Sequence, residues 1–220
     1  MKVLAEEPWS WALYEDGDRQ VLSVLKGGVG IYEVKIELLP REREAWAQSG
    51  VEGLYPLIEA IQRNHRQAIA ERAQERFSLA LSDFLLPGAD PVALTERWRP
   101  DRGACALVFS NEIWKSAQSA YEVLWAEAEV LRPEQGSDRV RMDVATTETL
   151  AAGNLHFPGG WETIAKKALN PGLAIARWRF GLPSGHFGAA YDGLIDLGDR
   201  LVWFPKPYRV LRGILQGQGA

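Results

Sequence analysis

The chain has 220 residues, which is enough for one large domain or two small domains with a substantial core. Hydrophobic residues make up 46% of it and charged residues 25%, proportions that are typical of globular proteins. The net charge of −4 and the isoelectric point of about 5.5 disfavour a nucleic-acid partner, since surfaces that bind nucleic acid are usually basic.

The lengths of the apolar runs and the number of cysteines indicate the cellular compartment of the protein. No stretch approaches the ~18 apolar residues of a membrane span, and the N-terminal residues lack the apolar segment of a secretory signal. The single cysteine, Cys105, rules out an intrachain disulfide and fits a reducing compartment. We therefore expect a cytoplasmic protein with no membrane partner. Because Cys105 lies in the apolar run GACALVF, we expect a buried structural cysteine.

The N-terminal region predicts a three-stranded antiparallel meander over residues 9–39. Its strands are WSWALYE, RQVLSVL and IYEVKIELL, and the first two are joined by an Asp16-Gly17 turn. Pro40 ends the third strand because proline cannot donate to a sheet ladder. Polar residues on one face of that strand indicate a sheet covered on one side only.

Helical patterns follow the meander. REREAWAQSG predicts a short helix closed by Gly50, and apolar residues at helical spacing predict a longer one from residue 54 to about 76. We expect the longer helix to pack on the apolar face of the sheet. This β-β-β-α unit leads us to divide the chain into modules of residues 1–90 and 91–220, with one continuous domain as the alternative.

The second half predicts further mixed structure, so the fold class is α+β, closed by a β-hairpin. The segment ACALVF is a candidate strand, and a strong helix follows with Ser110 or Asn111 as its cap. The hairpin turns at Gly198-Asp199. The remaining predicted elements are a short helix in PVALTERW, a strand at 139–145, a helix near 160–169, a strand at 173–180 and a short helix at 208–215.

The segment KGGVG resembles a phosphate-binding loop in composition alone. Lys26 precedes the glycines, no serine or threonine follows them, and the next predicted element is a strand instead of a helix. The sequence therefore favours a glycine connection between antiparallel strands.

Catalytic and metal-binding motifs are weak. His65, His156 and His186 show no zinc-ligand spacing, and we expect His65 to be a half-buried, hydrogen-bonded side chain on a helix. His156 and His186 lie in glycine-rich loops, and Ser184 lacks a nucleophile elbow. We predict no catalytic residue, no metal and no cofactor.

Three aspartates, Asp143, Asp192 and Asp196, are possible acid–base groups. Asp192 and Asp196 fall on one strand face by the two-residue period, and the favoured interpretation is a solvated face.

Acidity is concentrated near the N-terminus. Residues 1–90 hold 15 acidic and 10 basic side chains, whereas the remainder holds 14 and 15. An acidic surface suits a basic protein partner. The candidate binding residues lie on or near the predicted meander, and they are Glu15, Asp16, Asp18, Glu33 and Glu37.

Both ends of the chain resemble a known class of bacterial proteins. The motifs are WSWALYEDGDRQVLSVL with GGVGIYEVKIEL near the start, and YDGLIDLGDRLVWFPKPYRVL near the end. They resemble immunity proteins of polymorphic or contact-dependent toxin systems. The resemblance implies a cytoplasmic antitoxin that blocks a cognate toxin, and it carries over no active site.

The first functional hypothesis is therefore a non-enzymatic inhibitor that binds a cognate toxin, such as a nuclease. The alternative is a small-molecule enzyme or ligand-binding module, and a subunit of a larger complex is the third hypothesis. The oligomeric state is left open. The alternative pocket would be lined by Trp161, Trp178, His186, Asp192 and Trp203.

Overall fold

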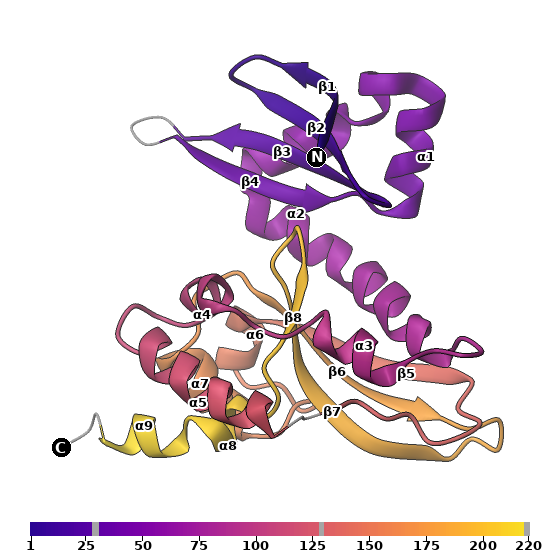
Figure 1. Cartoon of the computed structure of the whole chain (residues 1–220). Helices are drawn as coiled ribbons and strands as arrows, with labels where there is room; N and C mark the ends of the chain where they lie inside the picture. The colour runs from indigo at the N-terminus through magenta and orange to yellow at the C-terminus, as the bar shows by residue number, and fades with distance from the viewer. Residues whose placement is uncertain (28–30, 128–129, 218–220) are drawn as a thin grey trace. The chain divides into compact units, whose positions relative to one another are not determined.

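The computed structural model describes residues 1–27, 31–127 and 130–217, and the chain divides into two compact units (Figure 1). Unit 1 comprises residues 1–75 and 197–200, and unit 2 comprises residues 76–196 and 201–220. Each unit contains a four-stranded antiparallel sheet together with helices, which confirms the predicted α+β class. The predicted modules of 1–90 and 91–220 differ from these units, which divide within a helix and assign residues 197–200 to unit 1.

Unit 1 begins with its sheet, in the strand order β1-β2-β3-β4. The meander β2–β4 was predicted, but β1 was missed because its apolar residues are consecutive and do not alternate with polar ones. The elements are β1 (Lys2–Glu7), β2 (Trp11–Asp16), β3 (Arg19–Lys26), β4 (Tyr32–Glu37), α1 (Pro40–Ser49), the 3₁₀ helix η1 (Gly50–Gly53) and α2 (Tyr55–Ser82), which continues into unit 2.

The core of unit 1 lies between the sheet and α2. Leu13, Leu22 and Ile36 lie opposite one another on β2, β3 and β4, and all three are fully buried. They form one cluster with Ile58 and Ile61 of α2, as the expected packing of this helix on the apolar face requires. The helix is interrupted at Asn64 (φ −155°, ψ 92°), whose side-chain Oδ1 accepts a hydrogen bond from the Gln67 backbone N–H.

The hairpin loop at 197–200 belongs to unit 1 and adds a backbone hydrogen bond at the end of strand β4. The Glu37 N–H donates to the Gly198 carbonyl at 3.0 Å. Gly198 has φ 95°, and a Cβ there would lie 2.7 Å from the Lys35 carbonyl oxygen. Only glycine fits this approach, and the predicted hairpin turn at Gly198-Asp199 is confirmed.

Unit 2 contains the sheet β5-β6-β7-β8, and aromatic side chains dominate its core. Trp178 and Trp203 lie with ring centroids 6.3 Å apart, and Trp125 of α5 packs edge-on against Trp203. The elements are η2 (Asp83–Leu85), α3 (Pro91–Glu96), α4 (Arg102–Val108), α5 (Trp114–Ala126), β5 (Arg139–Thr146), α6 (Thr147–Ala151), α7 (Gly160–Lys167), β6 (Ala174–Gly181), β7 (Phe187–Asp196), β8 (Leu201–Trp203), α8 (Pro207–Val210) and α9 (Arg212–Gly217).

Two sequence-based expectations about the helices of unit 2 were wrong. The candidate strand ACALVF lies mostly within helix α4, where the Asp101 side chain accepts the Ala104 N–H at 2.7 Å and caps the first turn. The helix α5 begins at Trp114 with Ile113 at its N-cap, so neither Ser110 nor Asn111 caps it. Among the described helices, none combines the length and the hydropathy needed to cross a bilayer.

Two β-bulges in the pairing of β6 with β7 determine which β7 side chains lie on the same sheet face as Arg177 and Arg179 of β6. Leu194 pairs with Ala176, but Asp192 pairs with Arg177, so Gly193 (φ 89°) is an extra residue between them. A second shift between Arg179 and Gly181 brings Phe187 opposite Gly181. Since residues directly opposite in a sheet point to the same face, Asp192 and Phe187 join the face of Arg177 and Arg179.

Candidate functional site

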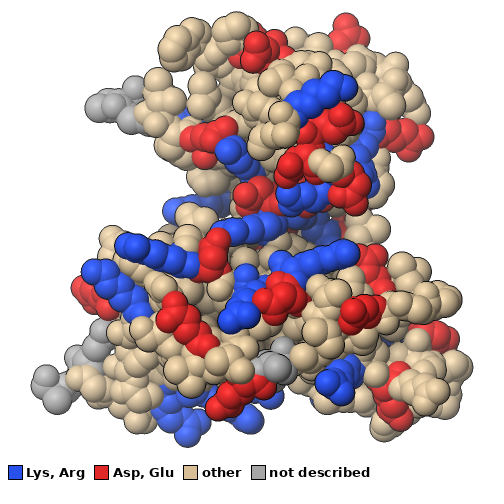
Figure 2. Space-filling view, in the orientation of Figure 1, with Lys and Arg blue, Asp and Glu red and all other residues tan. Residues whose placement is uncertain are grey.

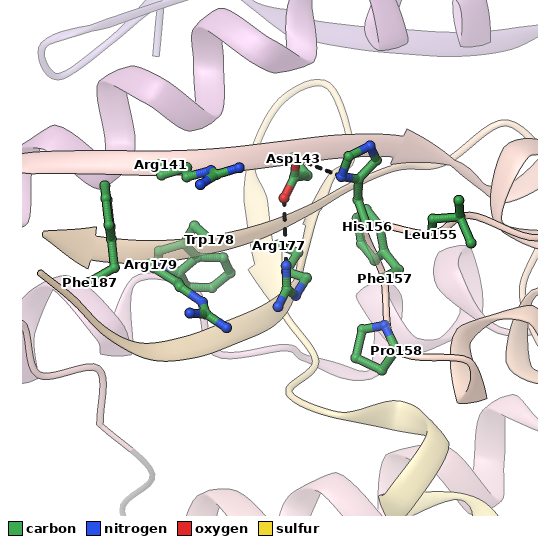
Figure 3. A pocket seen from close by; sticks show the side chains of 10 residues that line it. All are labelled: Arg141, Asp143, Leu155, His156, Phe157, Pro158, Arg177, Trp178, Arg179 and Phe187. Atoms are coloured by element: carbon green, nitrogen blue, oxygen red, sulfur yellow. Dashed lines mark ion pairs between the residues drawn. The ribbon is translucent and has the colours of Figure 1, made fainter. Parts of the chain in front are cut away.

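A groove of about 490 Å³ lies on unit 2, over strands β5 and β6 (Figure 3). Its volume is within the range of small-molecule sites. Strands supply its floor, and the loop between α6 and α7 together with the start of β7 supplies its walls. The lining residues are Arg141, Asp143, Leu155, His156, Phe157, Pro158, Arg177, Trp178, Arg179 and Phe187.

The floor of the groove is formed by the polar side chains that alternate with apolar ones along β5 and β6. In RVRMDVAT and AIARWRFG, polar residues alternate with apolar ones, so the apolar set faces the core and the polar set faces the groove. The register pairs Arg141 with Arg179 and Asp143 with Arg177. The sheet therefore aligns three guanidinium groups and one carboxylate on a single face.

Asp143 is the acidic centre of the groove. Its carboxylate lies 3.6 Å from the Arg177 guanidinium and 3.6 Å from Nδ1 of His156, between these two side chains (Figure 3). The Arg177 and Asp143 side chains are 22% and 28% exposed, so this pair is partly shielded from water. Asp143 thus balances the charge of Arg177 and lies beside the ring of His156.

Arg141 and Arg179 differ from Arg177 in their charge environment. Both are exposed, and neither has a carboxylate within ion-pair distance among residues 1–27, 31–127 and 130–217. Like charges directly opposite each other on neighbouring strands destabilise a sheet. The pair therefore concentrates uncompensated positive charge above the floor of the groove.

Apolar side chains close the two ends. At one end the Phe187 ring lies over Gly181, where an added Cβ would come within 2.7 Å of the ring. At the other end the loop supplies Leu155, Phe157 and Pro158 (Figure 3). The groove therefore combines a cationic floor with apolar walls, which can hold an anion that carries an apolar group.

Asp192 lies on the same strand face as Arg177, but helix α8 and the preceding loop cover it. Its carboxylate accepts hydrogen bonds from the Lys206 N–H at 3.0 Å and the Tyr208 hydroxyl at 3.1 Å. Burial raises the pKa of Asp192, and these hydrogen bonds only partly oppose that effect. Burial and the neighbouring Asp192 carboxylate together raise the pKa of Tyr208 to about 12.

The expectation of a solvated face bearing Asp192 and Asp196 was wrong. Both side chains are buried, and the bulge at Gly193 places them on opposite faces of β7. Asp196 forms an ion pair with Arg76 at 2.7 Å, in which the Asp196 side chain is 0% and the Arg76 side chain 6% exposed. These aspartates therefore do not form an acid–base pair.

The five residues of the alternative pocket do not come together in the groove. Trp161, Trp178 and Trp203 are each 1% exposed and belong to the core, and the Trp203 indole N–H donates to the Asp192 carbonyl at 2.9 Å. Of the five, Trp178 alone contributes to the groove. His186 lies in the exposed loop before Phe187, 4.0 Å from Glu134.

The acidic candidates lie on unit 1, and several have basic neighbours. Glu15 lies 3.7 Å from Lys2, Asp16 lies 2.7 Å from Arg19, and Glu33 lies 3.1 Å from Lys35. Asp18 is exposed in the β2–β3 turn, and Glu37 is half-buried at the end of β4. Figure 2 shows acidic and basic groups next to each other on the face drawn, so the acidity there is interrupted by positive charge.

Glu33 also accepts a hydrogen bond from the Ser23 hydroxyl at 2.6 Å. Burial acts to raise the pKa of Glu33, but the hydrogen bonds from Ser23 and Lys35 outweigh it and hold the pKa below its ordinary value. Glu33 is therefore held as a carboxylate on the outer face of the sheet.

The other candidates stand apart from the groove. His65 is half-buried as expected, and its ring packs edge-on against Tyr32 at 5.9 Å, but its Nδ1 is buried without a hydrogen-bond partner among the described residues. Burial, with Lys26 and Arg66 nearby, lowers the pKa of His65.

Cys105 is buried as predicted, and burial with the nearby carboxylates of Asp101 and Glu122 raises the pKa of its thiol to about 11. This thiol is therefore a poor nucleophile at neutral pH. Ser184 is exposed in the β6–β7 loop.

The glycine connection at KGGVG is only partly described, because Gly28, Val29 and Gly30 lie outside the described residues. The element that follows it is the strand β4, as expected. Within the described part of the chain, no three histidine, cysteine or acidic side chains gather as metal ligands.

Comparison of the chain with protein-family models, curated proteins and solved structures gave no match. Sequence reasoning considered His156 and Asp143 separately and missed Arg141, Arg177 and Arg179 as site residues. The available signal was the alternation of arginines with apolar residues in both strands, which places them on one face of a sheet.

Proposed function

We propose that the protein binds a small anionic organic ligand in the groove over β5 and β6. The observation that carries this proposal is the direct pairing of Arg141 and Arg179 on a concave surface with apolar ends. Arginine suits this role because its fork of N–H donors binds carboxylate and phosphate oxygens in pairs. The proposal develops the ligand-binding alternative and moves its site from His186 and the buried tryptophans to the arginine face.

Thermal unfolding in the presence of organic anions tests this proposal. A panel of aromatic and aliphatic carboxylates, sulfonates and phosphates should include members that raise the melting temperature, because a ligand that binds only the folded protein stabilises it. The substitutions Arg141→Gln and Arg179→Gln should each abolish the increase. Arg63→Gln is the matched control, since Arg63 is an exposed arginine of α2 in unit 1. If no anion gives a shift that depends on the groove arginines, the proposal is wrong.

A second candidate function is the inhibitor of a cognate bacterial toxin, and Trp9 supports it. This side chain is 89% exposed in the turn between β1 and β2, and its φ of 67° is unfavourable for any residue with a side chain. Exposed tryptophans are frequent anchors of protein interfaces. Further large apolar side chains are exposed in unit 1, at Val3, Ile31 and Tyr32.

Co-expression with the product of a neighbouring toxin gene tests this second candidate. The protein should protect cells and copurify with the toxin, and Trp9→Gly should weaken binding although it removes the backbone strain. The charge reversals Glu33→Lys and Glu37→Lys should slow association with a basic toxin without unfolding the protein. A lack of both protection and copurification would exclude this function.

A further inference from the structure

We propose that the anion held by Arg141 and Arg179 is the phosphate group of a small organic phosphate monoester, whose organic part lies against Phe187 and the 155–158 loop. This inference rests on the proposed function and specifies its ligand class. It follows from three features of the groove, namely its excess charge, the placement of the Arg141 and Arg179 guanidinium groups and its apolar ends.

The charge of the groove matches a dianion. Three arginines and one aspartate line it, and the aspartate lies between Arg177 and His156. Asp143 balances the charge of Arg177, so among the described residues the charges of Arg141 and Arg179 stay uncompensated. A phosphate monoester carries about −1.5 to −2 charges at pH 7, whereas a carboxylate or sulfonate carries about −1. The monoester is the anion that brings the groove closest to neutrality.

The geometry of the two arginines also favours a tetrahedral group. Side chains directly opposite on antiparallel strands have Cβ atoms roughly 4.5–5.5 Å apart, so both guanidinium forks can reach one bound group from neighbouring strands. A phosphate monoester offers three terminal oxygens and can accept paired hydrogen bonds from both forks. A carboxylate has two oxygens, which one fork satisfies, and the second arginine would then be left unbalanced.

The apolar ends select an organic ester over free phosphate. The ring of Phe187 packs against Gly181 at one end, and the side chain of Leu155 is fully exposed on the loop at the other end. An apolar or aromatic group attached to the phosphate would cover these surfaces and gain free energy in proportion to the area removed from water. Walls at both ends also limit the length of the ligand, which fits a small molecule better than an extended chain.

Isothermal titration calorimetry with four simple anions tests the phosphate assignment. Phenyl phosphate should bind at least tenfold more tightly than benzoate, benzenesulfonate or inorganic phosphate at pH 7.5 and moderate salt. Arg141→Gln and Arg179→Gln should each weaken phenyl phosphate at least tenfold, and Arg63→Gln should change nothing. Phe187→Ala should weaken phenyl phosphate but leave inorganic phosphate unchanged, because this side chain contacts only the organic part.

The results distinguish failure of the phosphate assignment from failure of anion binding by the groove. Equal affinities for benzoate and phenyl phosphate would overturn the phosphate assignment and leave anion binding intact. Absence of binding by all four anions, together with no stabilisation by the wider panel, would overturn both. A tyrosine-phosphorylated peptide that binds far more tightly than phenyl phosphate would overturn the small-molecule assignment in favour of a phosphoprotein partner.

Discussion

Arg141 on β5 and Arg179 on β6 face each other directly across an antiparallel strand pair, with both side chains exposed on the same face. Nothing in the packing of unit 2 requires two arginines there, because the apolar residues on the other face of these strands form the core. The arrangement costs stability through repulsion of like charges. A surface that is unfavourable in the free protein is consistent with a binding role.

The first prediction concerns this cost. Arg179→Gln should raise the free energy of unfolding by about 0.2–1 kcal/mol, because it removes the repulsion between like charges opposite each other. Arg141→Gln should give a similar gain, and the double variant should gain little more, since the repulsion can be removed only once. Urea denaturation in low salt measures this, and the gains should shrink as salt screens the charges. Loss of stability in both single variants would mean that the arginines contribute through packing.

The second prediction concerns Asp192. Its pKa in the folded protein is raised, chiefly by burial, so the stability that its protonated form contributes is complete below the unfolded pKa. That contribution is lost as the pH rises through the folded pKa. Relative to the variant D192N, the native protein should therefore lose stability as the pH rises above about 4, the ordinary pKa of an aspartate in the unfolded chain. Urea midpoints of both proteins across this range measure the difference.

The variant Tyr208→Phe tests the contribution of the Tyr208 hydrogen bond to the pKa of Asp192. Tyr208→Phe removes the hydroxyl that donates to the Asp192 carboxylate, so it should raise the pKa of Asp192 further and steepen the loss of stability with pH. A stability difference between the native protein and D192N that does not change with pH would show that burial of this carboxylate is compensated elsewhere.

Much of the strand pattern could be predicted, because it follows from local alternation and turn residues. The strands β2–β4, β5 and β6 and the hairpin turn at Gly198 all have such signals. The segment ACALVF could not be assigned from its apolar run alone, since short runs fit a buried strand and a buried helix equally. The Asp101 cap was the signal that favours the helix.

The groove could not be predicted as a unit, because it depends on register. The strands β5 and β6 are separated by residues 147–173, and no short turn fixes which arginine lies opposite which. The bulge at Gly193 could not be predicted from the two-residue period of a strand, because it inserts one extra residue. It places Asp192 on the face opposite Asp196. Individual residues such as His156 and Asp143 could be noted, but their proximity is a property of the tertiary fold.

The third prediction concerns the buried ion pair of Arg76 and Asp196. Asp196→Ala should lower the free energy of unfolding by about 3–5 kcal/mol, because it leaves the Arg76 guanidinium buried without this carboxylate. The double substitution Arg76→Met with Asp196→Leu should recover much of this loss, since apolar residues of similar size avoid the cost of burying charge. Chemical denaturation of the single and double variants measures the coupling. A small effect of Asp196→Ala would mean that water or another group replaces the carboxylate.

The last prediction compares two glycines that both have positive φ. Gly17 (φ 66°) has open space where a Cβ would lie, whereas a Cβ on Gly193 (φ 89°) would lie 2.0 Å from the Phe204 carbonyl oxygen. Gly17→Ala should therefore cost only the backbone term, about 1–2 kcal/mol. Gly193→Ala should cost on the order of 4 kcal/mol or more, because the clash is with backbone that donates to Gly193 at 2.9 Å and cannot move independently.

Urea denaturation of the two variants measures this difference, and calorimetric titration shows its effect on the groove. The bulge at Gly193 sets which residues of β7 face Arg177, so Gly193→Ala should also weaken binding of phenyl phosphate if the variant stays folded. Gly17 belongs to unit 1, and its substitution should leave that affinity unchanged. Equal losses of stability at the two positions would show that the β7–β8 region can shift to admit a methyl group, and that the bulge is less constrained than its geometry indicates.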